Sequence, residues 1–188
     1  MNLNFKMFEK AGRKNTDEAL RIAKKNADGN SINNIVVAST TGDTAEKAVE
    51  IFDPNVYNLV IVTHNYGFKD KPQEFDLDLM ARLNKKGVKI CTGTLAFSGV
   101  DSALQKTYGF WDFPALYARV VRTVFSDGVK VCHEMALMAT DGGYVEIGSD
   151  LICVAGTGHG ADTVCLIRAA NSRKFVDARI KAILAKPL

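Results

Sequence analysis

Four hydroxyl side chains and one glycine fall within the six residues Ser39-Thr40-Thr41-Gly42-Asp43-Thr44. The segment follows a short apolar run and opens a helical pattern, so a strand-to-helix turn is expected here. The first N–H groups of a helix have no partner within the helix and carry the positive end of its dipole. Hydroxyl donors add to them, and a glycine lets the backbone approach a ligand closely. The segment therefore predicts a site for a phosphate-type anion that needs no cationic side chain.

The same segment has a simpler interpretation. The alternative is a serine, threonine or aspartate that only caps the helix, next to a glycine in a tight turn. Four hydroxyls exceed what one cap needs. Asp43 would repel an anion if its carboxylate pointed into the site. We therefore interpret Asp43 as a cap of backbone N–H groups rather than as a ligand.

A second candidate loop is rich in glycine and lies between two apolar runs near the end of the chain. It reads Gly156-Thr157-Gly158-His159-Gly160-Ala161-Asp162-Thr163. Its three glycines suit a loop whose backbone contacts a ligand, and a flexible hairpin connection is the alternative. Asp43, His159 and Asp162 are candidates for an acid, a base and an electrostatic partner, but their spacing does not require such a cluster.

Two further segments carry polar or aromatic side chains. In Thr63-His64-Asn65-Tyr66-Gly67-Phe68, which follows another apolar run, the His64 or Asn65 side chain can bond a ligand. Tyr66 or Phe68 can stack on a ring, although we favour a core position for Phe68. The segment from Tyr108 to Phe113 contains four aromatic residues, interpreted as a satellite hydrophobic cluster, with a ring-stacking wall or a subunit contact as alternatives.

The elements that must position these loops alternate between strand and helix. Helical patterns cover about residues 15–29, 44–52, 72–83, 113–124 and 129–139, and apolar strand runs cover 35–38, 59–63, 88–91, 151–155 and 163–167. We expect Asn15 to cap the first helix and Pro72 to lie in the first turn of the third. Short crossovers between the first three strands predict a parallel, right-handed, doubly wound α/β sheet.

The end of the chain breaks this alternation. Seven residues separate the last two strands, so they are expected to be antiparallel neighbours, with the fifth strand at an edge of the sheet. In sheets of this kind ligands bind at the carboxyl ends of the strands. The three candidate loops should therefore meet at one edge and face one ligand.

The composition is that of an ordinary globular chain and argues against several functions. Apolar residues make up 47% of the 188 residues, which suits a single domain over residues 1–188. The net charge of +3 is scattered, so no nucleic-acid partner is expected. The absence of a long apolar run or a leader pattern predicts no membrane contact and a cytoplasmic location. Cys91, Cys132, Cys153 and Cys165 are expected to be buried thiols, and no metal site is predicted.

The order of these motifs resembles the C-terminal domain of pyruvate kinase, and most closely a family of stand-alone pyruvate kinase alpha/beta-domain proteins. The shared pieces are Gly12-Arg13-Lys14-Asn15-Thr16, Val36-Val37-Ala38-Ser39, Gly42-Asp43-Thr44-Ala45, Gly67-Phe68, Gly128-Val129-Lys130-Val131-Cys132 and Gly160-Ala161-Asp162-Thr163. The loop Thr40-Thr41-Gly42-Asp43-Thr44 also resembles the phosphate loop of flavodoxins, which hold flavin mononucleotide (FMN).

The resemblance implies a three-layer α/β/α domain whose mostly parallel five-stranded sheet has the order 3-2-1-4-5, with the last strand antiparallel. It does not imply pyruvate kinase activity, since the catalytic barrel has no counterpart in this chain. In the kinase the two loops jointly hold a sugar-bisphosphate effector, whereas the stand-alone family is associated with bound FMN. Asp43 argues against the bisphosphate. The resemblance also implies a homo-oligomer.

Three functions follow as hypotheses. The first is a protein that binds FMN or a related nucleotide, with the phosphate on Ser39, Thr41, Gly42 and Thr44 and the other two loops around the remainder. The second is a module without catalysis that senses a phosphorylated metabolite. The third is an uncharacterised enzyme that uses His159 and Asp162.

Overall fold

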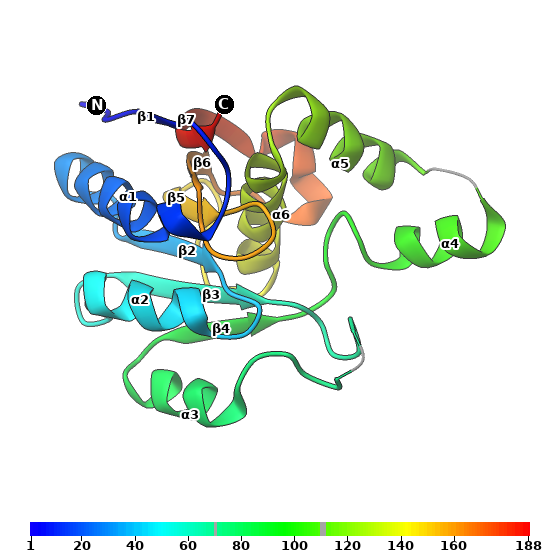
Figure 1. Ribbon diagram of the computed structural model, residues 1–188, viewed down its shortest axis with the longest axis horizontal. Helices are drawn as coiled ribbons and strands as arrows, with labels where there is room; N and C mark the ends of the chain where they lie inside the picture. The colour runs from blue at the N-terminus through cyan, green and yellow to red at the C-terminus, as the bar shows by residue number, and fades with distance from the viewer. Residues whose placement is uncertain (70, 110–111) are drawn as a thin grey trace.

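A seven-stranded mixed sheet with the order β1-β7-β6-β5-β2-β3-β4 runs through the centre of the protein (Figure 1). The structure is a computed structural model that describes residues 1–69, 71–109 and 112–188. The strands are β1 (Lys6–Phe8), β2 (Asn34–Ala38), β3 (Asn58–Thr63), β4 (Lys89–Thr92), β5 (Asp150–Ala155), β6 (Thr163–Arg168) and β7 (Arg179–Pro187). The helices are α1 (Thr16–Asn30), α2 (Asp43–Ile51), α3 (Leu77–Lys85), α4 (Val100–Tyr108), α5 (Phe113–Val124) and α6 (Asp127–Asp141), with short 3₁₀ turns η1 (Arg13–Asn15) and η2 (Ser172–Asp177).

The five predicted strands are present and pair as expected. β2 lies parallel to both β3 and β5, and β3 lies parallel to β4. β5 and β6 are antiparallel, because the loop between them is too short for a crossover helix. The prediction of an α/β fold with this internal strand order is confirmed.

The prediction of five strands is wrong, and so is the edge position of the fifth. β6 pairs on its far side with β7, which is antiparallel to it, and β7 pairs with β1 in parallel. β1 has only three residues, too few for a periodic signal. β7 mixes exposed, half-buried and buried positions and contains register shifts against β6, so its sequence lacks the continuous apolar run of the central strands.

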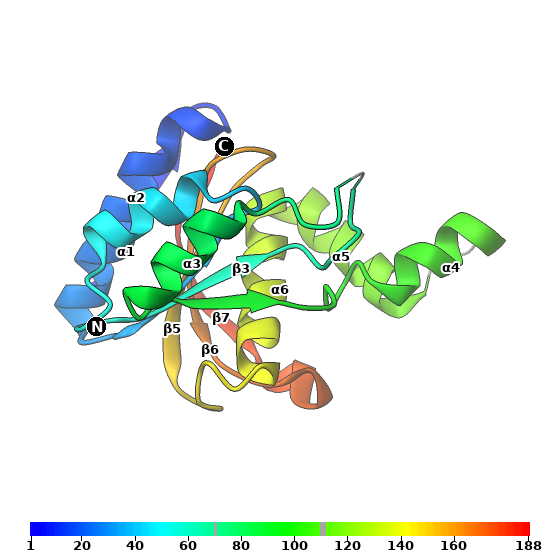
Figure 2. The ribbon, with the colours of Figure 1, turned by 90° about the horizontal axis from the view of Figure 1, so that it is seen from below.

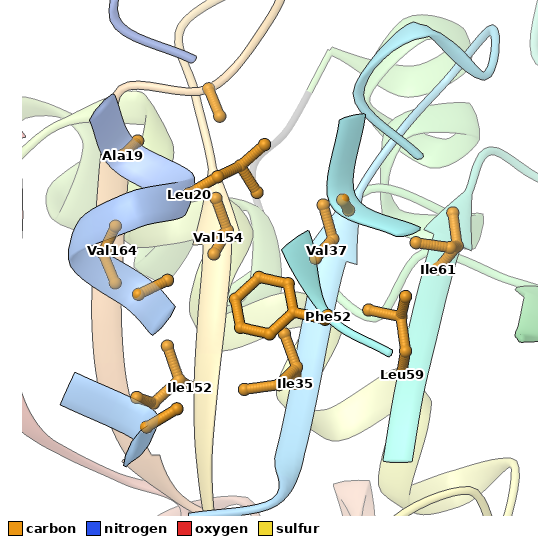
Figure 3. Packing of buried hydrophobic residues seen from close by; sticks show 14 of the residues in the cluster. Ala19, Leu20, Ile35, Val37, Phe52, Leu59, Ile61, Ile152, Val154 and Val164 are labelled. Carbon is orange, nitrogen blue, oxygen red and sulfur yellow. The ribbon is translucent and has the colours of Figure 1, made fainter. Parts of the chain in front are cut away.

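Alternate residues of the central strands serve two separate cores. Ile35 and Val37 of β2 belong to a core with residues of α1, α2 and α3, part of which is drawn in Figure 3. Val36 between them belongs to the other core, with residues of α6. Figure 2 shows α1 to α3 on one side of the sheet and α6 on the other. Each fully buried aliphatic side chain contributes about 1.5–3 kcal/mol. Both faces of the sheet are covered, which leaves its carboxyl-end edge as the place where loops can form a site.

One predicted helix start is confirmed without its side-chain cap, and another is wrong. α1 begins at Thr16 with Asn15 in the N-cap position, but the Asn15 side chain does not cap it, because the 3₁₀ turn η1 runs directly into α1 and the Asn15 Nδ2 donates to Lys10 O at 2.8 Å. Pro72 lies before α3, whose cap is Asp76, with its Oδ1 accepting from Leu79 N at 2.7 Å. In both places the capping residue depends on the path of the preceding loop, which the residue types alone do not determine.

The apolar stripe predicted for residues 113–124 is a helix, but most of the stripe faces outward. Phe113 is 88% exposed, and Leu116, Val120 and Val124 are exposed as well, while Val121 is buried. α5 packs against α6 through its buried residues Ala118 and Val121, while α4 extends away from the body of the protein in both ribbon views (Figures 1 and 2). Of the predicted aromatic cluster at 108–113, Phe110 and Trp111 lie outside the described residues.

The structure bears on the expectations for the cysteines and for membrane-spanning helices. All four cysteines are buried and unbridged, as predicted. Within residues 1–69, 71–109 and 112–188, every helix is too short or too polar to cross a bilayer.

Candidate functional site

The three candidate loops meet at the carboxyl-end edge of the sheet, around a cavity of about 650 Å³. One part of its wall is polar and comes from Arg13, from Gly158, His159 and Gly160, and from every residue of the segment 39–44 except Gly42. The other part lies toward α6 and includes Leu95, Ser98, Lys130, Glu134, Met135 and Met138. The cavity volume is within the range of small-molecule sites.

The start of α2 keeps two backbone donors available at this cavity. Ser39 Oγ accepts from Ala45 N at 3.2 Å, so Ser39 acts as the side-chain cap of the helix. The N–H groups of Asp43 and Thr44 have no acceptor among the described residues. Since Asp43 and Thr44 both line the cavity, these donors and the helix dipole can act on an anion there.

Gly42 is needed by the fold as well as by any ligand. Its φ of 117° is unfavourable for residues with a Cβ atom. A Cβ here would overlap the Leu79 side chain and touch the Phe75 ring at 3.6 Å. Gly42 therefore allows close packing of α2 against α3, whereas the sequence predicted that it would allow a ligand to approach the backbone.

Arg13 supplies a cation that sequence reasoning did not assign to the site. Its Nη2 lies 3.2 Å from Asp43 Oδ2, and the two side chains are 69% and 64% exposed. Asp43 thus forms an ion pair instead of the predicted backbone cap. The only sequence signal for Arg13 is that it lies within Gly12–Thr16, one of the segments shared with the resembling family. Nothing in that segment indicates which loop Arg13 contacts.

Asp162 is fully buried and holds two segments together. Its Oδ2 accepts from Gly12 N at 2.9 Å and Thr157 N at 3.2 Å, and its Oδ1 accepts from Thr163 Oγ1 at 2.8 Å. Neither Asp162 nor Thr157 nor Thr163 lines the cavity. The geometry gives Asp162 a structural role and separates it from His159, which is exposed at the cavity wall.

The glycine-rich loop is clamped on the start of α1. Thr16 Oγ1 accepts from Ala161 N at 3.0 Å and donates to Arg13 O at 2.7 Å. A Cβ on Gly160 would come within 2.6 Å of the Arg13 Cα, and its φ of 77° also favours glycine. This contact fixes Arg13 beside the cavity and replaces the flexible hairpin of the alternative interpretation.

The loop after β3 brings a histidine to the cavity. His64 Nδ1 donates to Glu74 Oε2 at 2.8 Å, and its ring lies against Phe68 with 4.0 Å between ring centroids. Burial alone would raise the pKa of Glu74, but the hydrogen bonds from His64 and Lys69 hold that pKa below its ordinary value. His64 is thereby oriented by a carboxylate that the sequence analysis did not identify.

The remaining residues of this loop differ in their roles. Thr63 is buried, lines the cavity and donates from its Oγ1 to Thr40 O at 3.2 Å, which ties two candidate loops together. Asn65 lies away from the cavity, and its Nδ2 donates to Tyr66 O. Phe68 is 42% exposed, so its predicted core position is wrong.

The α6 side of the cavity contains a buried ion pair that the sequence analysis did not assign. Lys130 Nζ lies 2.6 Å from Glu134 Oε2, and the two side chains are 2% and 5% exposed. The spacing of four residues places both on one face of α6. A lysine and a glutamate at this spacing in the middle of a helix whose neighbouring residues are mostly apolar is the signal that could have pointed to them.

Comparison with known proteins shows no family for this chain. No protein-family model matches the chain. The solved structure of Cryptosporidium parvum pyruvate kinase in complex with ADP is similar over 82% of this chain, at 15% sequence identity and a TM-score of 0.44. The chain spans 24% of the length of that kinase. The fold class rests on the sheet topology above and on no property of the kinase.

Substituting Asp162→Asn is expected to lower the free energy of unfolding by about 2–4 kcal/mol. Both carboxylate oxygens of Asp162 accept hydrogen bonds, whereas the NH₂ group of asparagine cannot accept and leaves buried donors without a partner. Asp43→Asn is the matched control. It removes a carboxylate from an exposed pair and is expected to change stability by less than about 1 kcal/mol. Urea unfolding measures both. Equal small effects would show that the buried carboxylate does not hold the loop.

Proposed function

We propose that this protein binds a phosphorylated small molecule in the cavity, and that FMN is its best candidate ligand. The observation that carries the proposal is the pairing, in one cavity, of free helix N–H groups with a wall of apolar side chains. Phosphate groups bind at helix N-termini without further cationic help. The proposal concerns binding and includes no pyruvate kinase activity.

The phosphate would lie at the start of α2. The N–H groups of Asp43 and Thr44 would donate to it, with the hydroxyls of Thr41 and Thr44 beside them. Arg13 can join them, because an exposed ion pair is worth only about 0–1 kcal/mol and exchanges easily for a phosphate.

The rest of the ligand would lie toward α6. Val62, Leu95, Met135 and Met138 are buried residues that border the cavity and offer apolar surface. Methionine side chains adapt to flat ring systems and make favourable contacts with them. A flavin suits this wall better than a sugar bisphosphate, which would place a second phosphate against apolar groups.

Two alternatives use the same cavity. A module that senses a sugar phosphate would use the α2 end alone. An enzyme would need an acid or base at the cavity, and the His64–Glu74 pair fits that role better than His159 with Asp162, since Asp162 lies outside the cavity. Assembly into a homo-oligomer is a further prediction. The exposed apolar side chains of α5 are a surface through which two copies could associate.

Adding FMN to the purified protein is expected to raise the melting temperature, and riboflavin, which lacks the phosphate, is expected to raise it less, because a ligand of the folded state alone stabilises that state. Differential scanning fluorimetry measures the shifts, and native mass spectrometry detects any flavin that co-purifies. Identical shifts with FMN and riboflavin would exclude phosphate recognition. A response to sugar phosphates alone would favour the sensing module.

Substitutions at the exposed ion pair are expected to change FMN affinity in opposite directions. Arg13→Gln removes a cation and should weaken binding about three- to tenfold, whereas Asp43→Asn removes a repulsive charge and should strengthen it by up to about fivefold. Arg21→Gln, on the exposed Arg21–Glu18 pair of α1 away from the cavity, is the control and should leave the affinity unchanged. Fluorescence titration gives each Kd. Equal affinities of the Arg13→Gln and Arg21→Gln variants would exclude a contact between Arg13 and the phosphate.

A further inference from the structure

The α6 side of the cavity wall contains one of the most enclosed charged groups in the described chain. The Lys130 side chain is 2% exposed and donates to Ser98 Oγ at 2.9 Å as well as to Glu134 Oε2 at 2.6 Å. Glu134 Oε1 accepts from Phe97 N at 2.7 Å. The charges are therefore fixed between α6 and the loop that follows β4.

Stability alone does not explain this pair. Removing two charges from water costs several kcal/mol per ion, and a buried pair of this kind can often be replaced by apolar residues without loss of stability. Burial lowers the pKa of Lys130, and the neighbouring Glu134 carboxylate opposes that effect. A buried lysine held in place beside a cavity is a candidate for ligand recognition.

The hydrogen bonds around Lys130 are incomplete. An ammonium group has three protons, and Ser98 and Glu134 take two of them. Asp101 does not take the third proton, since its Oδ2 has no partner among the described residues, and the Lys130 Nζ otherwise faces the Phe97 ring at 5.8 Å from its centroid. Buried polar groups are normally satisfied, and Lys130 lines the cavity, so an acceptor on a ligand there can take this proton.

We propose that Lys130, held by Ser98 and Glu134, forms a second binding pole that donates a hydrogen bond to a carbonyl oxygen at the far end of the ligand. This inference rests on the proposed function for the phosphate end. Its ligand class is a phosphate monoester joined to an aromatic ring that carries carbonyl groups. A flavin mononucleotide belongs to this class, and a simple sugar phosphate does not.

The main test compares two probes, FMN and ribose 5-phosphate, on the intact chain. The variant combines Lys130→Met with Glu134→Gln, which removes both charges and keeps an oxygen to accept from Phe97 N. FMN affinity is expected to fall at least about tenfold, while the affinity for ribose 5-phosphate stays unchanged, because a hydrogen bond from a charged donor is lost only at the ring end. The control combines Arg122→Gln with Asp127→Asn, which removes another ion pair of the cavity wall and should spare FMN binding.

Analogues of FMN in which sulfur replaces the oxygen at ring position 2 or 4 provide a test on the unmodified protein, should the double variant fail to fold. Sulfur is a weak acceptor, so at least one analogue is expected to bind about tenfold more weakly than FMN. Unchanged FMN affinity in the folded double variant, or equal binding of FMN and both analogues, would overturn the second pole. If the unmodified protein binds neither FMN nor ribose 5-phosphate, the proposed function itself fails, and this inference fails with it.

Discussion

The buried carboxylate of Asp162 is the interaction on which the arrangement of the site depends. A charge with no solvent contact must be satisfied by donors, and Asp162 takes them from Gly12, Thr157 and Thr163. The consequence is that the segment before α1 and the loop before β6, separated by about 150 residues, are locked together. Arg13 follows Gly12 in the first of these segments, and its guanidinium contacts Asp43 at the start of α2.

The cavity wall, as far as the structure describes it, carries charges of both signs and no excess of cations. Each of the lysines and arginines on its described wall has a carboxylate partner: Arg13 with Asp43, Lys47 with Asp17, Arg122 with Asp127, and Lys130 with Glu134. Glu46 and Glu50 line the cavity as well, so the wall does not attract anions from a distance, and recognition depends on which pair a ligand can replace. Exposed pairs exchange at lower cost than the buried one, and Arg13–Asp43 is the exposed pair at the first turn of α2, so our proposal gives the phosphate to Arg13 and a neutral polar group to Lys130.

The sequence contained the central strands, the hydroxyl-rich turn and the glycine loop, because each is a local pattern. A short run of apolar, mostly β-branched residues such as Leu59–Val62 is typical of a strand that is buried on both faces of a sheet. β7 was missed because its alternation is interrupted by register shifts. Arg13, Glu74 and Lys130 were missed because their roles arise from contacts between segments far apart in the chain. Gly42 and Asp162 were found, but their structural roles appear only in the packed fold.

Everything proposed for the site requires that the first-turn N–H groups of α2 bind a phosphate. A titration of ¹⁵N-labelled protein with FMN, followed by amide chemical shifts, measures this contact. The largest amide proton shifts are expected at Asp43 and Thr44, with a smaller change at Ala45, whose N–H is already held by Ser39. Binding of FMN that leaves the Asp43 and Thr44 amides unchanged would contradict it.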